Sequence, residues 1–126
     1  MGADLELLEA AIGHSFRARD LCRRALTLKS LVFEQAAGVV HVHTDNEQLE
    51  FLGDAVLGFL VSEALVGRYP DLPEGRLSKI KAHLVSATHL YEVAQRISLG
   101  DYLYLGRGEE MSGGRAKRAL LANAIE

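Results

Sequence analysis

Cysteine, tryptophan, proline and long apolar runs are scarce or missing in this sequence. One of the 126 residues is cysteine, two are proline and none is tryptophan. The single cysteine, Cys22, excludes an internal disulfide and is typical of a reducing compartment. The few prolines argue against intrinsic disorder. No apolar run approaches the roughly 18 residues of a membrane-spanning helix, and the acidic N-terminus differs from a signal peptide. We therefore expect a cytoplasmic protein with no membrane association.

The composition is that of an ordinary globular domain. Apolar residues make up 48% of the chain and charged residues 25%, with a formal net charge of −3, and the length suits one domain. The charge is unevenly distributed, because residues 1–71 hold six basic and eleven acidic residues, whereas 72–126 hold eight and six. This pattern excludes a globally basic nucleic-acid binder. It suits a cation site beside a phosphate-binding track, and equally an ordinary solvated surface.

The apolar residues recur with helical spacing along almost the whole chain, which predicts an all-α fold. The first helix is expected after Asp4 as N-cap, with Gly13 as its stop. Asp20 is the predicted cap of the second helix, and Thr44 with Glu47 forms a predicted capping box for the long fourth helix. The remaining boundaries are expected near 20–28, 30–37, 45–68, 74–86, 87–97 and 119–126.

Two segments are predicted to be loops. Residues 38–45 contain His41 and His43, which lack a third metal ligand nearby, and residues 105–115 are rich in glycine. The helix predicted after the second loop has only eight residues, about 12 Å of length, and no stop signal. The sequence therefore predicts that the chain is a piece of a longer protein.

Three acidic residues form a stripe on the predicted long helix. Glu47, Glu50 and Asp54 fall within roughly 60° of one another, and Gly53 in the helix interior costs about 1 kcal/mol relative to alanine. Both features make sense if a cation neutralises the stripe and another backbone packs closely at Gly53. The alternatives are that the stripe is a solvated face and that Glu47 only completes the capping box.

A second pair of oxygen-bearing residues, Asn123 and Glu126, lies at i and i+3 on the last predicted helix. Two helices that present oxygen ligands to each other form the kind of site that Mg²⁺ prefers. Arg115, Lys117 and Arg118 precede this helix and are candidates for contacts with RNA phosphates.

Four segments resemble the endonuclease domain of the ribonuclease III family. The signature is NEQLEFLGDAVL at 46–57, and the others are ALTLKS at 25–30, EGRLSKIKAHLV at 74–85 and LGRGEEMSGGRAKRALLANAIE at 105–126. The resemblance implies a homodimeric, mostly helical domain that hydrolyses phosphodiester bonds of double-stranded RNA with Mg²⁺, or Mn²⁺ in its place. The implied products carry 5′-phosphate and 3′-hydroxyl ends, and the implied substrates are ribosomal RNA precursors and structured messenger and transfer RNAs.

The resemblance also implies a role for individual residues. Asn123 stands where the family usually has aspartate, so we expect weaker metal binding rather than a missing site. By this resemblance the metal ligands are Glu50, Asp54, Asn123 and Glu126, and two of them, Asp54 and Glu126, are also the catalytic residues. Glu47 and Glu74 are the implied secondary acids. Phe51 is the implied aromatic residue of the dimer interface.

The ending at Glu126 is a second departure from the family. Family members continue this helix and usually carry a double-stranded-RNA-binding domain, which is absent from this chain. Residues 1–126 are therefore predicted to be the catalytic domain, truncated at its C-terminal end. Two alternatives stay open: a catalytically impaired dimeric domain that binds duplex RNA, which Asn123 and the truncation favour, and a helical interaction domain whose acidic stripe is only surface.

Overall fold

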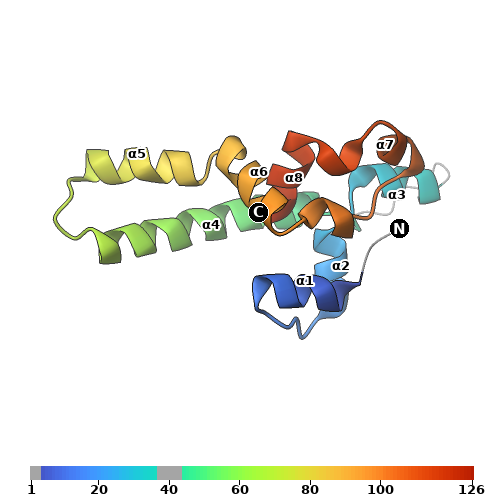
Figure 1. Cartoon of the computed structure of the whole chain (residues 1–126), viewed down its shortest axis with the longest axis horizontal. Helices are drawn as coiled ribbons and strands as arrows, with labels where there is room; N and C mark the ends of the chain where they lie inside the picture. Colours follow the sequence, from blue (N-terminus) through green and yellow to red (C-terminus); the bar gives the residue numbers. More distant parts are fainter. Residues whose placement is uncertain (1–3, 37–43) are drawn as a thin grey trace.

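The computed structural model describes residues 4–36 and 44–126, and over these residues it confirms the all-α prediction (Figure 1). Two 3₁₀ turns, η1 at Leu99–Tyr102 and η2 at Gly114–Ala116, separate the last helices. His41 and His43 lie outside the described residues. The α-helices are α1 Leu5–Ile12, α2 Arg19–Ala25, α3 Lys29–Ala36, α4 Glu47–Arg68, α5 Glu74–Leu84, α6 Ala87–Arg96, α7 Arg107–Met111 and α8 Arg118–Ile125.

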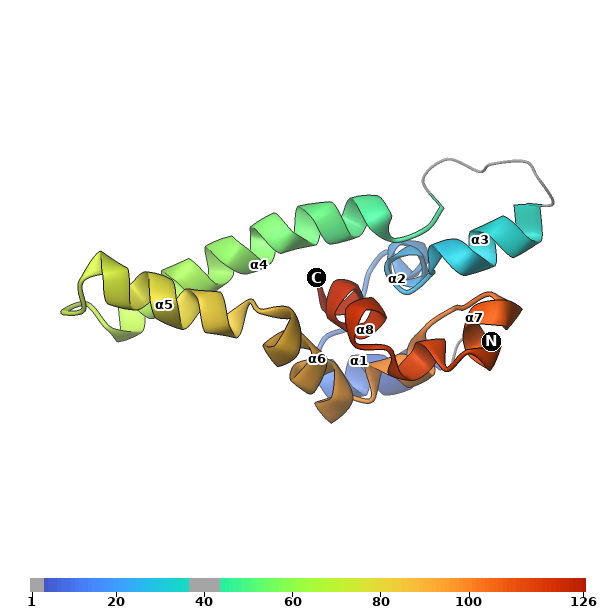
Figure 2. The ribbon, with the colours of Figure 1, turned by 90° about the horizontal axis from the view of Figure 1, so that it is seen from above.

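The helices form a body and a long projection. α4 and α5 pack side by side as an antiparallel hairpin that extends away from the other helices, and α8 ends beside α4 near the base of this hairpin (Figures 1 and 2). Within the described ranges, no helix combines the length and apolar character that a membrane crossing requires.

The core lies in the body and is formed mainly by α1, α2, α6, η1 and α8. The most extensive packing between two helices joins α6 to α8, and Leu103 and Ala94 are completely buried. A β-bridge between Thr27 and Tyr104 ties the end of α2 to the segment after η1. This core fixes where α8 lies, and with it the residues at the end of the chain.

The predicted caps are confirmed at the first helix and wrong at two others. The Asp4 carboxylate accepts a hydrogen bond from the Glu6 amide at 2.9 Å, and Gly13 ends α1 in the left-handed conformation with φ 68°. α2 follows Ala18, so Asp20 lies within its first turn instead of capping it. α4 has Asn46 at its N-cap position, and its first amide, that of Glu47, donates to the Asp45 side chain at 3.0 Å. The predicted Thr44–Glu47 capping box is therefore not how this helix starts.

The glycine-rich segment predicted as a loop instead contains α7 and most of η2. α7 forms because Glu34 of α3 accepts hydrogen bonds from the Arg107 amide at 2.8 Å and the Gly108 amide at 3.0 Å. Gly106 lets the two backbones approach, since a Cβ there would lie 2.6 Å from the Ser30 carbonyl oxygen. These contacts span more than 70 residues of sequence, so local composition does not reveal them.

Candidate metal-binding and active site

The start of α4 is anchored by a buried polar residue. Asn46 is 7% exposed; its side-chain amide donates to the Ala25 carbonyl at 3.2 Å, and its backbone amide donates to the Thr27 carbonyl at 2.9 Å. Because a buried amide must be hydrogen-bonded to be tolerated, these contacts fix the start of α4 relative to α2. This role of Asn46 was not predicted from the sequence, although an asparagine directly before an acidic, apolar helix is the type of residue that caps helices.

The end of α8 approaches the backbone of α4 at Gly53. A Cβ at this position would lie 1.6 Å from the Glu126 carbonyl oxygen, far inside any possible contact. Only glycine fits, which confirms the expectation that another backbone packs closely there. The close approach brings the end of α8 to the turn of α4 that carries Glu50 and Asp54.

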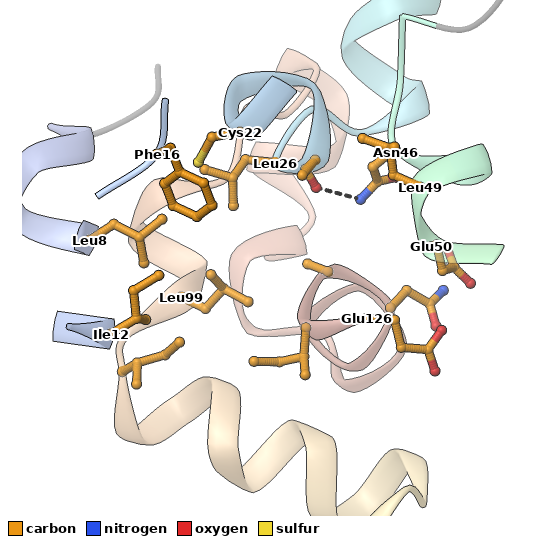
Figure 3. Close-up of a pocket in the computed structure, with 15 residues that line it drawn as sticks. Leu8, Ile12, Phe16, Cys22, Leu26, Asn46, Leu49, Glu50, Leu99 and Glu126 are labelled. Atoms are coloured by element: carbon orange, nitrogen blue, oxygen red, sulfur yellow. Dashed lines mark hydrogen bonds between the residues drawn. The ribbon is translucent and has the colours of Figure 1, made fainter. Parts of the chain in front are cut away.

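Glu50 and Glu126 lie at one rim of a cavity of about 260 Å³ (Figure 3). Burial raises the pKa of the Glu50 carboxyl above its ordinary value, and the charges of Glu47 and Asp54 raise it further. Burial likewise raises the pKa of Glu126, with further increases from Asp54 and Glu50. The carboxylates of α4 and α8 therefore repel one another in a partly buried environment, where water screens their charges less.

Asn123 lines the same cavity as Glu50 and Glu126. The donors are carboxylate and amide oxygens, which are the ligands of hard cations such as Mg²⁺. Within the ranges that the structure describes, no three histidine, cysteine, aspartate or glutamate side chains already enclose a metal position. The residues nevertheless fit a divalent cation in chemistry and in charge, because burial and then mutual repulsion raise both pKa values, and a cation would offset the repulsion.

The two secondary acids lie in different places. Glu47 is next to the cluster, where it pairs with Lys29 at 3.3 Å and lines a groove together with Glu50 and Asn123. Glu74 opens α5 at the far tip of the α4–α5 hairpin, and its carboxylate accepts a hydrogen bond from Ser78 at 2.6 Å. Within one copy of the chain, Glu74 is not part of the acidic cluster.

The three basic candidates for RNA contact are engaged within the protein. The Arg115 guanidinium donates to the carbonyls of Gly100 at 2.9 Å and Leu103 at 2.8 Å, and it pairs with Glu110 at 2.7 Å. Lys117 pairs with Glu109. These contacts hold η2 against η1 and the core, so they support the start of α8.

Arg118 lies over the ring of Tyr91, with 5.3 Å between the guanidinium carbon and the ring centroid. Its Nη1 also donates a long hydrogen bond of 3.5 Å to the Thr88 hydroxyl. The contact joins the first residue of α8 to α6. The contacts of Arg115, Lys117 and Arg118 thus show a structural role. A role of these residues in RNA contact stays a prediction.

Phe51 points out of the molecule and is 84% exposed. It belongs to an exposed apolar face on α4 that a single chain leaves in contact with solvent, since Leu52, Phe59 and Leu60 are each more than half exposed as well. Contiguous exposed apolar surface marks an interaction site in soluble proteins. The position of Phe51 is compatible with a contact between two copies.

Comparisons with known proteins agree with this geometry over nearly the whole chain. The family model described as Ribonuclease-III-like matches residues 18–126. Ribonuclease 3 of Solibacter usitatus is 57% identical over the whole chain, which covers 47% of that protein. Ribonuclease 3 of Geobacter sulfurreducens is 47% identical over 98% of the chain, which covers 49% of that protein. The chain thus spans about half the length of these relatives.

A solved structure shares the fold. The nuclease domain of ribonuclease III from Campylobacter jejuni superposes with a TM-score of 0.85 at 35% sequence identity, over 97% of this chain and 79% of that one. That structure is described as having a flexible region involved in dimer formation. With a matching family model, relatives along its full length and a shared helical fold, the chain belongs to the ribonuclease III family and has the all-α fold of its nuclease domain.

Proposed function

We propose that this domain is an Mg²⁺-dependent endoribonuclease that hydrolyses phosphodiester bonds of double-stranded RNA and leaves 5′-phosphate and 3′-hydroxyl ends. The observation that supports this most strongly is the pair of partly buried carboxyls, Glu50 and Glu126, which two different helices bring into mutual repulsion. Such an arrangement costs stability unless a cation binds to it. Family membership supports the same reaction.

The residues that would hold the metal are Glu50, Asp54, Asn123 and Glu126. When bound, Mg²⁺, or Mn²⁺ in its place, supplies positive charge that activates an attacking water and offsets negative charge on the phosphodiester. The chain itself contributes orientation, because Gly53 fixes the separation of α4 and α8. Asp54 and Glu126 are the residues that we assign to catalysis, as carboxylates facing the reacting phosphate, and the acids Glu47 and Glu74 are assigned supporting roles.

A homodimer would present two copies of this cluster to a duplex. Two strands require two cuts, and a two-fold axis relating two sites matches the symmetry of the duplex. The exposed Phe51 on α4 supports an interface on this face. A-form RNA is recognised by shape and through phosphates and 2′-hydroxyls, so the substrates that we propose are structured transcripts in the cytoplasm, including precursors of ribosomal, messenger and transfer RNAs.

Asn123 favours a second candidate function. It supplies an amide in place of a carboxylate, so the cluster carries one negative charge less than an aspartate there would give. A cluster of lower charge binds a divalent cation less tightly. The second candidate is a dimeric domain that binds duplex RNA with impaired hydrolysis.

The test is cleavage of an end-labelled RNA duplex by the chain in Mg²⁺, next to an Asn123→Asp variant. Cleavage by both, with phosphatase-sensitive 5′ ends on the products, supports the endonuclease. Cleavage by Asn123→Asp alone supports the impaired duplex-binding domain. No cleavage by either variant would contradict the proposal for this chain.

A further inference from the structure

The junction between α5 and α6 carries two histidines that the proposed reaction does not use. His83 lies in the last turn of α5 and His89 in the first turn of α6, where the hairpin joins the body (Figures 1 and 2). His83 is exposed. Because successive residues of a helix are about 100° apart, it lies on the face of α5 opposite Lys81 and Val85, which line a groove against α4. His83 therefore lies away from the apolar α4 face that we assign to the contact between two copies.

One serine hydroxyl holds the backbones of both histidines. The Ser86 hydroxyl donates a hydrogen bond to the His83 carbonyl at 2.8 Å and accepts one from the His89 amide at 3.2 Å. The second of these bonds is the N-cap of α6. The relative position of the two histidines is therefore set by the turn itself, before any ligand binds.

The two imidazole rings are separated as two ligands of one metal ion are. Their centroids lie 5.4 Å apart. Bonds from zinc to histidine nitrogen are about 2.0–2.1 Å long, so two imidazoles that share a tetrahedral zinc have centroids roughly 5 Å apart. Only a small adjustment of the exposed His83 side chain is needed to bring both rings onto one ion.

Glu92 adds a negative charge beside the pair. Its Oε2 lies 4.0 Å from Nδ1 of His89, whose side chain is 22% exposed. A carboxylate next to a metal-binding imidazole orients the ring and raises its basicity. Within the described parts of the chain no third side chain completes an enclosed site, so water would fill the other coordination positions.

We propose that His83 and His89 together bind a divalent transition-metal ion of the Zn²⁺ class at the α5–α6 junction. Imidazole nitrogen suits zinc, nickel and copper, whereas the carboxylate and amide oxygens at α4 and α8 suit Mg²⁺. The two places therefore select different ions. An ion shared by the last turn of α5 and the first turn of α6 links the hairpin to the body, and because it binds only the folded arrangement it stabilises that arrangement. This site does not depend on the proposed hydrolysis.

The test follows the histidine side-chain signals of the isotope-labelled chain by NMR during a titration with Zn²⁺. We expect the signals of His83 and His89 to shift together at the same Zn²⁺ concentration, and neither to shift with Mg²⁺. Outer-shell partners of a ligand already contribute about 10–100-fold to metal affinity, so loss of a direct ligand in His83→Gln should weaken the response of His89 by at least about tenfold. His14→Gln is the matched control, because His14 is exposed and its ring contacts Phe16 instead of a second histidine. It should leave the response of the pair unchanged.

Two outcomes would overturn the inference. One is a Zn²⁺ titration that leaves the signals of His83 and His89 in place, including one in which only His41 and His43 respond. The other is an equally strong response of His89 in His83→Gln, which would show binding to single imidazoles instead of a shared site. A circular dichroism spectrum of each variant identifies any loss that comes from unfolding. Since the titration involves no RNA, its result is separate from the outcome of the cleavage test.

Discussion

Among the described glutamates with a shifted pKa, some are held by a partner and others repel their neighbours. Glu34, Glu109 and Glu110 accept hydrogen bonds from backbone amides or basic side chains, and these contacts lower the pKa of each carboxyl. Glu50 and Glu126 have the opposite environment, and their pKa values are raised by burial and by neighbouring acids. The paired carboxylates stabilise the fold. The partly buried carboxylates that repel one another lower its stability, and such groups typically mark a functional site.

Replacing Glu50 by glutamine is expected to stabilise the metal-free chain at neutral pH. The folded-state pKa of Glu50 is raised above its ordinary value of 4.5. At pH values between the ordinary pKa and the raised folded-state pKa, the folded protein binds more protons than the unfolded chain. The contribution of Glu50 to stability therefore decreases as the pH rises through this window. Glu50→Gln removes this penalty. Thermal melts in a metal chelator should show a higher Tm for Glu50→Gln at pH 7, with a difference that shrinks toward pH 4.

Glu63→Gln is the matched control, since Glu63 is an exposed residue further along the same helix. It should change the Tm little at either pH, as surface substitutions usually stay within about 0.5 kcal/mol. A Glu50→Gln protein that melts below the unchanged chain at pH 7 would contradict the repulsion described for the cluster.

At the scale of elements, the site depends on how closely α8 can approach α4. The approach is set by Gly53 on one side and, on the other, by the packing of α8 against α6 and by Arg115, which ties η2 to the core. None of the residues in this arrangement except Glu126 is a candidate ligand. Positioning of the ligands thus depends on residues that are not ligands themselves, on Gly53 of α4 and on the packing of α8 against α6 and η2.

Gly53→Ala is expected to displace the end of α8 and to destabilise the domain. The added Cβ would fall 1.6 Å from the Glu126 carbonyl oxygen, so backbone must move. Overpacking of this kind typically costs about 1–3 kcal/mol. Urea unfolding should therefore show a lower midpoint and, in Mg²⁺ titrations, a weaker response of the Tm to the metal.

Gly67→Ala provides the control on the same helix. Nothing lies within 4 Å of a Cβ at that position, and replacing an exposed helical glycine by alanine usually adds up to about 1 kcal/mol of stability. Gly53→Ala should therefore lower the free energy of unfolding, whereas Gly67→Ala should raise it. A Gly53→Ala protein as stable as Gly67→Ala would contradict the close contact between α4 and the end of α8.

Some features of these elements could be predicted from the sequence, and others could not. Apolar periodicity predicted the helices, and the cost of a glycine inside a helix pointed to Gly53 as a place where another backbone packs closely. Local pattern failed for α7 and for the start of α4, because the Arg107 amide of α7 bonds to Glu34 and Asn46 bonds to the Ala25 carbonyl, and in both pairs the partner is distant in sequence. The sequence also could not reveal the structural contacts of Arg115, because its partners include the carbonyls of residues 100 and 103, which only the folded chain brings near; its contact with RNA stays a prediction.

At the scale of the whole molecule, the hairpin of α4 and α5 leaves an apolar face without a partner in one chain. Phe51→Asp is expected to abolish self-association without unfolding the domain, since the side chain is 84% exposed and contributes little to the core. Burying a phenylalanine against a second copy removes roughly 150–250 Å² from water, and a carboxylate there opposes the contact.

Sedimentation velocity at micromolar concentration should show a dimer for the unchanged chain and a monomer for Phe51→Asp, each with the same helical circular dichroism spectrum. A monomeric unchanged chain, or a Phe51→Asp protein that still dimerises, would contradict the proposed interface.

Carboxylates from α4 and α8 together are expected to bind a divalent cation, and calorimetric titration of the chain with Mg²⁺ measures this binding. We predict saturable binding by the unchanged chain, tighter binding by Asn123→Asp, and loss of binding by the Glu50→Gln/Asp54→Asn double variant, which should remain folded. Absence of saturable binding by the unchanged chain, or equal binding by the double variant, would contradict the account and leave the acidic stripe as the surface of a helical interaction domain.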